Sequence, residues 1–184
     1  MKLIIVRHGQ TIANSKKIIQ GKMPGKLTKK GIEQSKIVGK QLKEKYPKID
    51  LVFCSPLNRC VETLNNILEE YPIESEILMS NLLEERGFGE WEGTEENLID
   101  WEEIDKDSIE NKKMGVESWV DVQKRVELFL EDLKLEDNKE TVLIVSHGGP
   151  IKVMINKITG KEFDNIEVEN GKIIELDYET ELEY

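Results

Sequence analysis

The chemistry that this sequence can perform centres on its two histidines. His8 and His147 are the only histidines in the chain, each directly follows a short apolar run, and each precedes a glycine. An imidazole can act as a nucleophile or move a proton near neutral pH, and a glycine lets the backbone approach a ligand closely. Two histidines in such matching positions favour one shared reactive site over two unrelated hydrogen-bonded residues.

The arginines indicate what this site would bind. The chain has four arginines against 22 lysines (26 − 4), and Arg7 stands directly before His8. Arg59 comes soon after another apolar run, and we expect Arg86 and Arg125 to form ion pairs at the surface. A guanidinium is favoured where a planar fork must grip a carboxylate or a phosphate. Arg7 and Arg59 beside two histidines therefore predict an anion site.

Strands that alternate with helices must position these residues. Buried apolar runs predict strands at 2–6, 51–54 and 141–145, and weaker runs predict strands at 77–79 and 172–178. Amphipathic stretches and stretches that begin with proline predict helices at 29–45, 57–70, 118–135 and 150–158. This order is typical of an α/β domain with three layers (αβα) and a mostly parallel central sheet. Ligands of such sheets bind beyond the carboxyl ends of the strands, where both histidines would lie.

The rest of the chain supports a single domain over residues 1–184. Residues 94–117 are acidic and weakly periodic, which predicts short helical pieces that form either a lid or a solvated excursion. Asn170-Gly171 predicts a hairpin turn, with a strand near 166–168 before it. The glutamates at 179, 181 and 183 predict an acidic tail.

Composition and charge exclude several function classes. The net charge of −11 argues against a nucleic-acid interface and against anionic membranes, and no signal peptide or membrane span is visible. Cys54 and Cys60 are too few for a disulfide framework or a zinc cage, so we expect a reduced cytoplasmic protein with no metal and no cofactor. A local cationic cluster can still attract a phosphate, because salt screens distant carboxylates over about 8 Å.

Five segments together resemble one known family. They are residues 7–11 with Asn14, Leu27-Thr28 with Gly31 and Gln34, residues 55–63 around Arg59, residues 83–93, and residues 146–149. In this order and spacing the chain, from residue 2 to about 153, is similar to the histidine phosphatase superfamily, the phosphoglycerate mutase-like proteins. The resemblance implies that family's fold and a metal-independent phosphomonoesterase acting on a small phosphate ester.

The resemblance also implies a role for each matching residue. His8 would be the nucleophile that forms a phosphohistidine, while Arg7, Arg59 and His147 would clamp the phosphoryl oxygens. Glu85 would be the proton donor and later the base, because it lies three residues before Phe88 and four before Gly89; Glu84 and Glu92 are its nearest rivals. The further phosphate-binding positions would be Asn14, Gln20, Gly21 and Gly148. Ala13 departs from the family, where many members carry Trp, and this leaves the substrate open.

The physical chemistry of phosphoryl transfer agrees with these roles. The reaction spreads negative charge over three oxygens, which two guanidiniums, an imidazolium and a helix N-terminus just after Gly9 could stabilise. His8 must attack as a neutral imidazole, with its other nitrogen held by an acceptor such as a backbone carbonyl, and a cationic surround lowers its pKa. Glu85 must arrive protonated, which burial and the charge of the phosphate favour.

Three alternatives compete with a phosphatase. A mutase of the same family would need to exclude water, and the resemblance implies a longer segment between the acidic loop and the second histidine for a mutase. Only 54 positions separate Gly93 from His147 here (147 − 93), which favours an accessible site and hydrolysis. A phosphate-binding module without activity would be expected to lack one of the catalytic positions. A cysteine-phosphatase loop needs five residues between Cys and Arg, whereas four separate Cys54 from Arg59. Within the family, candidate substrates are sugar phosphates, phosphoglycerates and α-ribazole phosphate.

Overall fold

A five-stranded, mostly parallel sheet forms the centre of the computed structural model, which describes residues 1–136 and 138–179. The strands are β1 (Lys2–Arg7), β2 (Leu51–Cys54), β3 (Ile77–Met79), β4 (Thr141–Ser146) and β5 (Ile173–Asp177). Their order is β3-β2-β4-β1-β5, and β5 alone runs antiparallel to its neighbour. The predicted mostly parallel sheet is confirmed.

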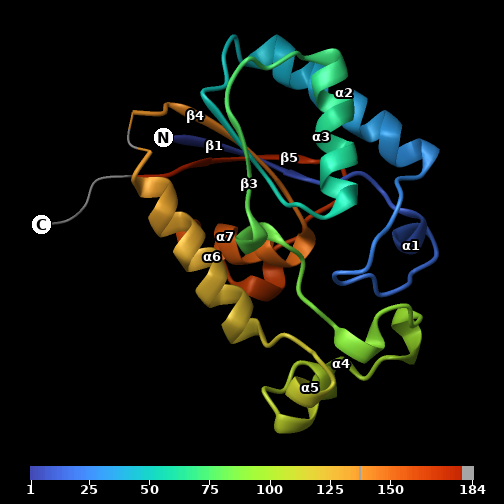
Figure 1. Ribbon diagram of the computed structural model, residues 1–184. Coiled ribbons are helices and arrows are strands. Elements are labelled where there is room, and N and C mark those ends of the chain that lie inside the picture. Colours follow the sequence, from blue (N-terminus) through green and yellow to red (C-terminus); the bar gives the residue numbers. More distant parts are fainter. Residues whose placement is uncertain (137, 180–184) are drawn as a thin grey trace, which may run out of the picture.

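Four long helices cover the two faces of this sheet. Helices α2 (Lys29–Lys45) and α3 (Asn58–Glu70) lie on one side, and α6 (Trp119–Lys134) and α7 (Gly148–Thr159) lie on the other (Figure 1). The alternation of β1 explains both cores, since successive side chains of a strand point to opposite faces. Ile4 and Val6 are buried with the α2 and α3 side chains, whereas Leu3 and Ile5 are buried with those of α6 and α7. The three-layer αβα architecture is therefore also confirmed.

The start of α7 differs from the sequence prediction in a way that matters for the site. The helix begins at Gly148 with His147 as its N-cap residue, whereas the sequence suggested a start at Pro150. Pro150 fits within the first turn, because the N–H groups of that turn have no partner inside the helix. The positive end of α7 consequently follows β4 without a connecting loop.

Short helices fill the rest of the chain. They are α1 (Ile12–Ser15), α4 (Trp101–Ile104), α5 (Ile109–Lys113) and 3₁₀ turns at Asn81–Leu83, Gly89–Trp91, Glu96–Leu98 and Phe163–Asn165. The prediction that 94–117 is helical in pieces is right, and α4 and α5 lie at the lower end of the molecule in Figure 1. Within the described ranges, no helix is long and apolar enough to cross a membrane.

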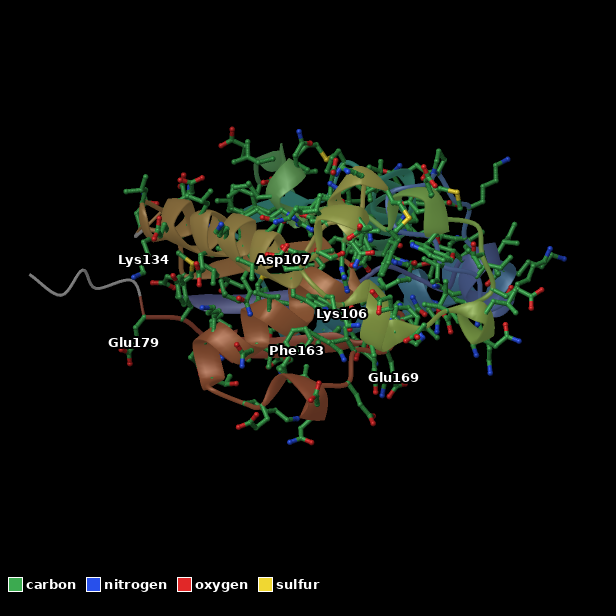
Figure 2. All side chains as sticks on the ribbon, turned by 90° about the horizontal axis from the view of Figure 1, so that it is seen from below. Lys106, Asp107, Lys134, Phe163, Glu169 and Glu179 are labelled. Carbon is green, nitrogen blue, oxygen red and sulfur yellow. The ribbon has the colours of Figure 1, made fainter. Side chains whose placement is uncertain are left out.

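The predicted strand near 166–168 is wrong. Residues 166–169 form no strand: β5 pairs with β1, Ile173 opposite Val6, and its outer edge has no partner strand among the described residues. Ile166 and Val168 are nevertheless buried, and their apolar pattern reflects packing of an irregular segment that runs between Phe163 and Glu169 in Figure 2. A turn does occur at 170–171, where Gly171 has φ +67°. Beyond Glu179, the predicted acidic tail lies outside the described residues.

Candidate active site

Strand pairing brings the two histidines together. β1 and β4 run parallel with Arg7 opposite Ser146, so the chain leaves both strands at the same edge of the sheet. The His8 backbone N–H then donates to the Ser146 carbonyl at 3.0 Å, and the two imidazole centroids lie 5.1 Å apart. Both side chains are buried, His147 completely. The expectation that these residues share one site is correct.

Arg59 joins the two imidazoles. It lies in the first turn of α3, and its Nε is 3.3 Å from His8 Nε2 and 3.1 Å from His147 Nδ1. Its Nη2 donates to the Gly21 carbonyl at 2.6 Å and its Nη1 to the Met23 carbonyl at 3.1 Å. A guanidinium has five N–H donors. With three of them used, two (5 − 3) have no partner among the described residues and could bind an anion.

The hydrogen bonds also fix the tautomer of each histidine. Nδ1 of His8 lies 2.8 Å from the Gly9 carbonyl, so this nitrogen carries the proton and Nε2 keeps its lone pair. This is the backbone carbonyl partner that a histidine nucleophile requires. In His147, Nδ1 accepts from Arg59, and Nε2 donates to Ser55 Oγ at 2.8 Å. Each imidazole therefore has one defined neutral form.

Burial and positive charge keep both imidazoles neutral. Burial is the largest cause that lowers the pKa of His8 well below its ordinary value, followed by the guanidiniums of Arg59 and Arg7. Burial also lowers the pKa of His147, again followed by Arg59. The first result agrees with the expectation for a nucleophile. The second corrects the expected imidazolium at 147, because Arg59 already donates to the nitrogen that would take the proton.

A helix N-terminus does follow Gly9, at the four-residue α1 capped by Thr11, but the longer helix that starts at the site is α7. The N–H of Gly9 donates to Thr63 Oγ1 at 3.0 Å, and that of Gln10 donates to Gln34 Oε1 at 2.9 Å, so neither is free for a ligand. At Gly148, the first residue of α7, an added Cβ would lie 3.5 Å from Arg7 Cζ. The positive end of this 12-residue helix therefore lies beside the Arg7 guanidinium, where an anion is favoured.

Glu85 is the acidic residue of its loop that reaches the site. Its Oε1 accepts from the backbone N–H groups of Arg86 at 2.9 Å and Gly149 at 3.1 Å. Of its two rivals, Glu84 forms an ion pair with Lys22 at 3.2 Å. The other, Glu92, accepts the backbone N–H groups of residues 22 and 88, so its carboxylate holds two loops together. The geometry thus favours Glu85 for proton transfer.

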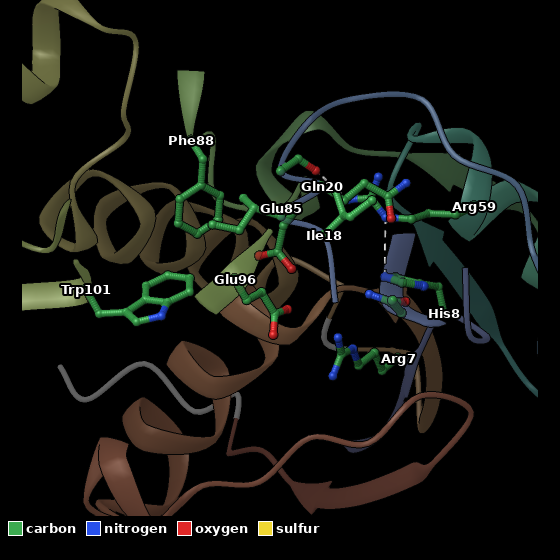
Figure 3. A pocket seen from close by; sticks show the side chains of 12 residues that line it. Arg7, His8, Ile18, Gln20, Arg59, Glu85, Phe88, Glu96 and Trp101 are labelled. Carbon is green, nitrogen blue, oxygen red and sulfur yellow. Dashed lines mark hydrogen bonds between the residues drawn. The ribbon is translucent and has the colours of Figure 1, made fainter. Parts of the chain in front are cut away.

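These side chains surround a cavity of about 160 Å³ (Figure 3). Its lining includes seven predicted site residues: Arg7, His8, Asn14, Gln20, Gly21, Arg59 and Glu85. It also includes residues with no predicted site role in catalysis or phosphate binding: Ile18, Ile19, Phe88, Glu96 and Trp101. His147 and Gly148 do not line the cavity. His147 accepts a hydrogen bond from Arg59 and so helps to hold it in place, and Gly148 lies beside the guanidinium of Arg7.

Two buried donors at the cavity have no partner among the described residues. They are Nε of Arg7 and Nε2 of Gln20, and such groups in a folded protein ordinarily find a hydrogen bond. The Oε1 of Gln20 is held by Thr11 Oγ1 at 2.8 Å, which fixes the orientation of its amide. An anion in the cavity would satisfy unpaired donors of this kind.

Sequence reasoning missed three residues that hold the site. Asn170 donates to the His8 carbonyl at 2.9 Å and to Asn14 Oδ1 at 3.3 Å, although it lies 162 residues from His8. Thr63 and Ser55 bond to Gly9 and His147. Ser55 and Thr63 belong to the recognised segment 55–63, which could have drawn attention to them, whereas no local signal indicates Asn170.

The expectation that Arg86 and Arg125 form ion pairs is right, but their placement at the surface is wrong for both, most of all for Arg86. Its side chain is 1% exposed, and its guanidinium lies over the rings of Phe88 at 5.0 Å and Trp119 at 4.7 Å. It donates to the carbonyls of Glu117 and Ile104 and pairs with the carboxylate of Asp105. Arg125 pairs with Glu117 at 2.6 Å, and both side chains are largely buried. Arg86 thus ties the Glu85 loop to the segment 94–117.

Comparisons with known proteins agree with this geometry. Residues 3–183 match the model of the histidine phosphatase superfamily (branch 1). A 2,3-bisphosphoglycerate-dependent phosphoglycerate mutase of Bartonella henselae is 32% identical, with 89% of this chain and 84% of the relative covered. An adenosylcobalamin/alpha-ribazole phosphatase of Salmonella typhimurium is 30% identical, with 86% and 79% covered.

A solved structure is similar over almost the whole chain. It is the alpha-ribazole phosphatase of Shigella flexneri, which is 28% identical at a TM-score of 0.83, with 97% of this chain and 91% of that chain covered. The paired histidines, the bridging arginine and the matched family model lead to one conclusion. The chain belongs to branch 1 of the histidine phosphatase superfamily.

Proposed function

We propose that this protein hydrolyses small phosphate monoesters through a phosphohistidine at His8. In the first step, the lone pair of His8 Nε2 forms a bond to phosphorus, and the bond from phosphorus to the ester oxygen breaks. In the second step, water attacks the phosphohistidine, which releases inorganic phosphate and restores the neutral imidazole. The observation that carries this proposal is the 3.3 Å contact between His8 Nε2 and Arg59, which places the nucleophilic nitrogen beside a phosphate-binding group.

Glu85 moves the protons in this scheme. As an acid it gives its proton to the departing ester oxygen, and as a carboxylate it then takes a proton from the attacking water. Its Oε1 is held by two backbone N–H groups, whereas Oε2 has no hydrogen bond to the other described residues, and the side chain lines the cavity (Figure 3). Arg7 and Arg59 stabilise the phosphoryl oxygens, with help from the side-chain amides of Asn14 and Gln20 and from the positive end of α7.

A single cluster of cations favours a phosphatase over a mutase. Among the lining residues, Arg7 and Arg59 are the cations, and they serve one phosphoryl group. A mutase primed by a bisphosphate must also hold a second anionic group, but the remaining charged residues of the lining are Glu85 and Glu96. We therefore propose hydrolysis as the main reaction. We also propose that the protein acts in the cytoplasm, since Cys54 and Cys60 are free thiols and a reducing compartment keeps thiols in that form.

A labelling experiment tests the proposal. The enzyme is mixed with a ³²P-labelled phosphomonoester, quenched within milliseconds in alkali, and analysed for a protein-bound label that acid releases, which is the signature of phosphohistidine. We expect this label in the wild type and its absence in His8→Ala, with phosphate released in the absence of any bisphosphate primer and in the presence of a chelator. Chelator-sensitive hydrolysis that survives His8→Ala would contradict the mechanism.

A further inference from the structure

The outer wall of the cavity consists of residues that the phosphoryl transfer does not use. Phe88 and Trp101 form an edge-to-face pair with centroids 6.0 Å apart, and the carboxylate of Glu96 lies near them on the way to Arg7 (Figure 3). A leaving group that extends from a phosphate at Arg7 and Arg59 must contact this wall. The wall therefore determines which esters fit.

Backbone contacts hold Glu96 in this position. The N–H of Glu96 donates to the Lys17 carbonyl at 2.9 Å, and Ile18 forms an antiparallel bridge with Glu95. One residue further along, the Ile19 N–H donates to the Thr94 carbonyl at 2.9 Å. The segment that carries Glu96 is thus joined to the loop that supplies Gln20 and Gly21 to the phosphate end of the cavity.

Contacts with neighbouring residues also hold the aromatic pair of Phe88 and Trp101 in place. Arg86 lies over the ring of Phe88 at 5.0 Å and is buried by the 94–117 segment. Trp101 begins α4, whose N-cap Asp100 accepts the Glu103 N–H at 3.2 Å. Trp101 nevertheless keeps 42% of its surface exposed, and it lines the cavity. An exposed tryptophan beside a carboxylate forms a surface that a cation can approach.

The two ends of the cavity carry opposite charge. The guanidiniums of Arg7 and Arg59 lie at the phosphate end, and Glu96 lies at the outer end without an ion pair among the described residues. Burial lowers the pKa of Arg7, and the charges of Glu85 and then Glu96 oppose that effect, so both carboxylates act on the phosphate clamp. An anionic leaving group would be repelled at the outer end, whereas a cationic one would be attracted by Glu96 and by the aromatic rings.

We infer that the substrate is a phosphomonoester whose leaving group carries an ammonium, which Glu96, Phe88 and Trp101 recognise while Arg7 and Arg59 hold the phosphate. The inference rests on the proposed phosphatase function and adds a specificity determinant to it. Aromatic walls alone would suit a neutral apolar group equally well. The carboxylate of Glu96 favours a cation, since it attracts an ammonium and gains nothing from an uncharged group.

Matched esters test this inference. The cationic substrates are phosphocholine and phosphoethanolamine, the neutral ones are 3,3-dimethylbutyl phosphate, which has the shape of phosphocholine, and propyl phosphate, and the anionic one is 3-phosphoglycerate. The variant is Glu96→Gln, and its control is Glu95→Gln, which removes a neighbouring exposed carboxylate that does not line the cavity. The readout is the ratio of kcat/KM between cationic and neutral esters of equal size.

We expect the wild type to prefer at least one cationic ester over its neutral counterpart by about tenfold, the combined effect of a partly exposed ion pair and a cation–π contact. Glu96→Gln should lower that ratio by about five- to tenfold and should raise kcat/KM for 3-phosphoglycerate. Glu95→Gln should change neither. A merely structural role of Glu96 would instead reduce all five activities together.

The failures of the two proposals are distinguishable. If no ester is hydrolysed, para-nitrophenyl phosphate included, and no acid-labile adduct forms, the phosphatase function itself is wrong. If the esters are hydrolysed but neither cationic ester is preferred, the inference about the ammonium is wrong. It is also wrong if Glu96→Gln leaves the ratio unchanged or lowers all activities equally.

Discussion

Replacing Arg59 by lysine separates the charge of this residue from its geometry. The side chain is 1% exposed, and its three engaged N–H groups serve two imidazoles and the carbonyls of Gly21 and Met23. Lysine keeps the positive charge but has three N–H donors on one compact centre and cannot span these partners. The variant therefore retains the local positive charge while it loses the planar fork that we propose binds the phosphate.

The expected loss follows from the donors that remain for the phosphate. Two N–H groups of Arg59 are free to bind phosphoryl oxygens, and removal of one strong donor of this type costs about 3–4 kcal/mol of transition-state stabilisation. We expect kcat/KM of Arg59→Lys to fall by about 100- to 1000-fold, and Arg59→Ala to lose at least as much. The carbonyls left without a donor should also lower the free energy of unfolding by about 1–3 kcal/mol each.

The assay must distinguish lost chemistry from lost structure. Initial rates at pH 7.5 are compared with unfolding by urea, and Arg125→Lys is the control, because that guanidinium pairs with Glu117 away from the cavity. Guanidinium ion added at low concentration should partly restore the activity of Arg59→Ala. The reasoning would be refuted if folded Arg59→Lys kept kcat/KM within about tenfold of the wild type, that is within about 1.4 kcal/mol.

Three further predictions follow from the same contacts. Glu85→Gln should slow esters with poor leaving groups more than para-nitrophenyl phosphate; equal slowing would reassign the acid. The free energy of unfolding should fall as pH drops below about 6.5, by up to about 1.4 kcal/mol per pH unit for each buried histidine, because burial lowers the pKa of His8 and His147 and the unfolded chain then binds more protons. Urea titrations at pH 7.5 and 5.5 measure this, and a smaller slope in His8→Ala would support it, while an unchanged slope would contradict it. Arg86→Met should cost about 1–3 kcal/mol of stability, since the Glu117 carbonyl loses its buried donor; a denaturant midpoint equal to that of the wild type would show that the contacts of Arg86 contribute nothing.

Most of the central architecture could be predicted from the sequence, for a local reason. Apolar runs of four to six residues behind His8 and His147 specify buried parallel strands, and such strands present their carboxyl ends at one edge. The positions of Arg7 and Arg59 relative to those runs were enough to expect one anion site. A site built from residues at strand ends can therefore be predicted from the sequence.

Contacts between distant segments could not be predicted in this way. Arg86 is buried because Ile104, Asp105 and Glu117 fold over it, and no pattern near residue 86 indicates this. The same holds for the neutral form of His147, which depends on the direction from which the Arg59 Nε–H approaches.

What the sequence by itself determined is the set of reactive groups and the sheet edge at which they meet, because hydrophobic periodicity and strand direction are local properties of the chain. The tertiary structure alone decided the proton positions, the supporting Asn170 and which carboxylate of the segment 94–117, Glu96, lines the cavity. The physical reason is that hydrogen bonds and burial depend on which surfaces meet across long sequence separations, and residue types leave that choice open until the chain packs.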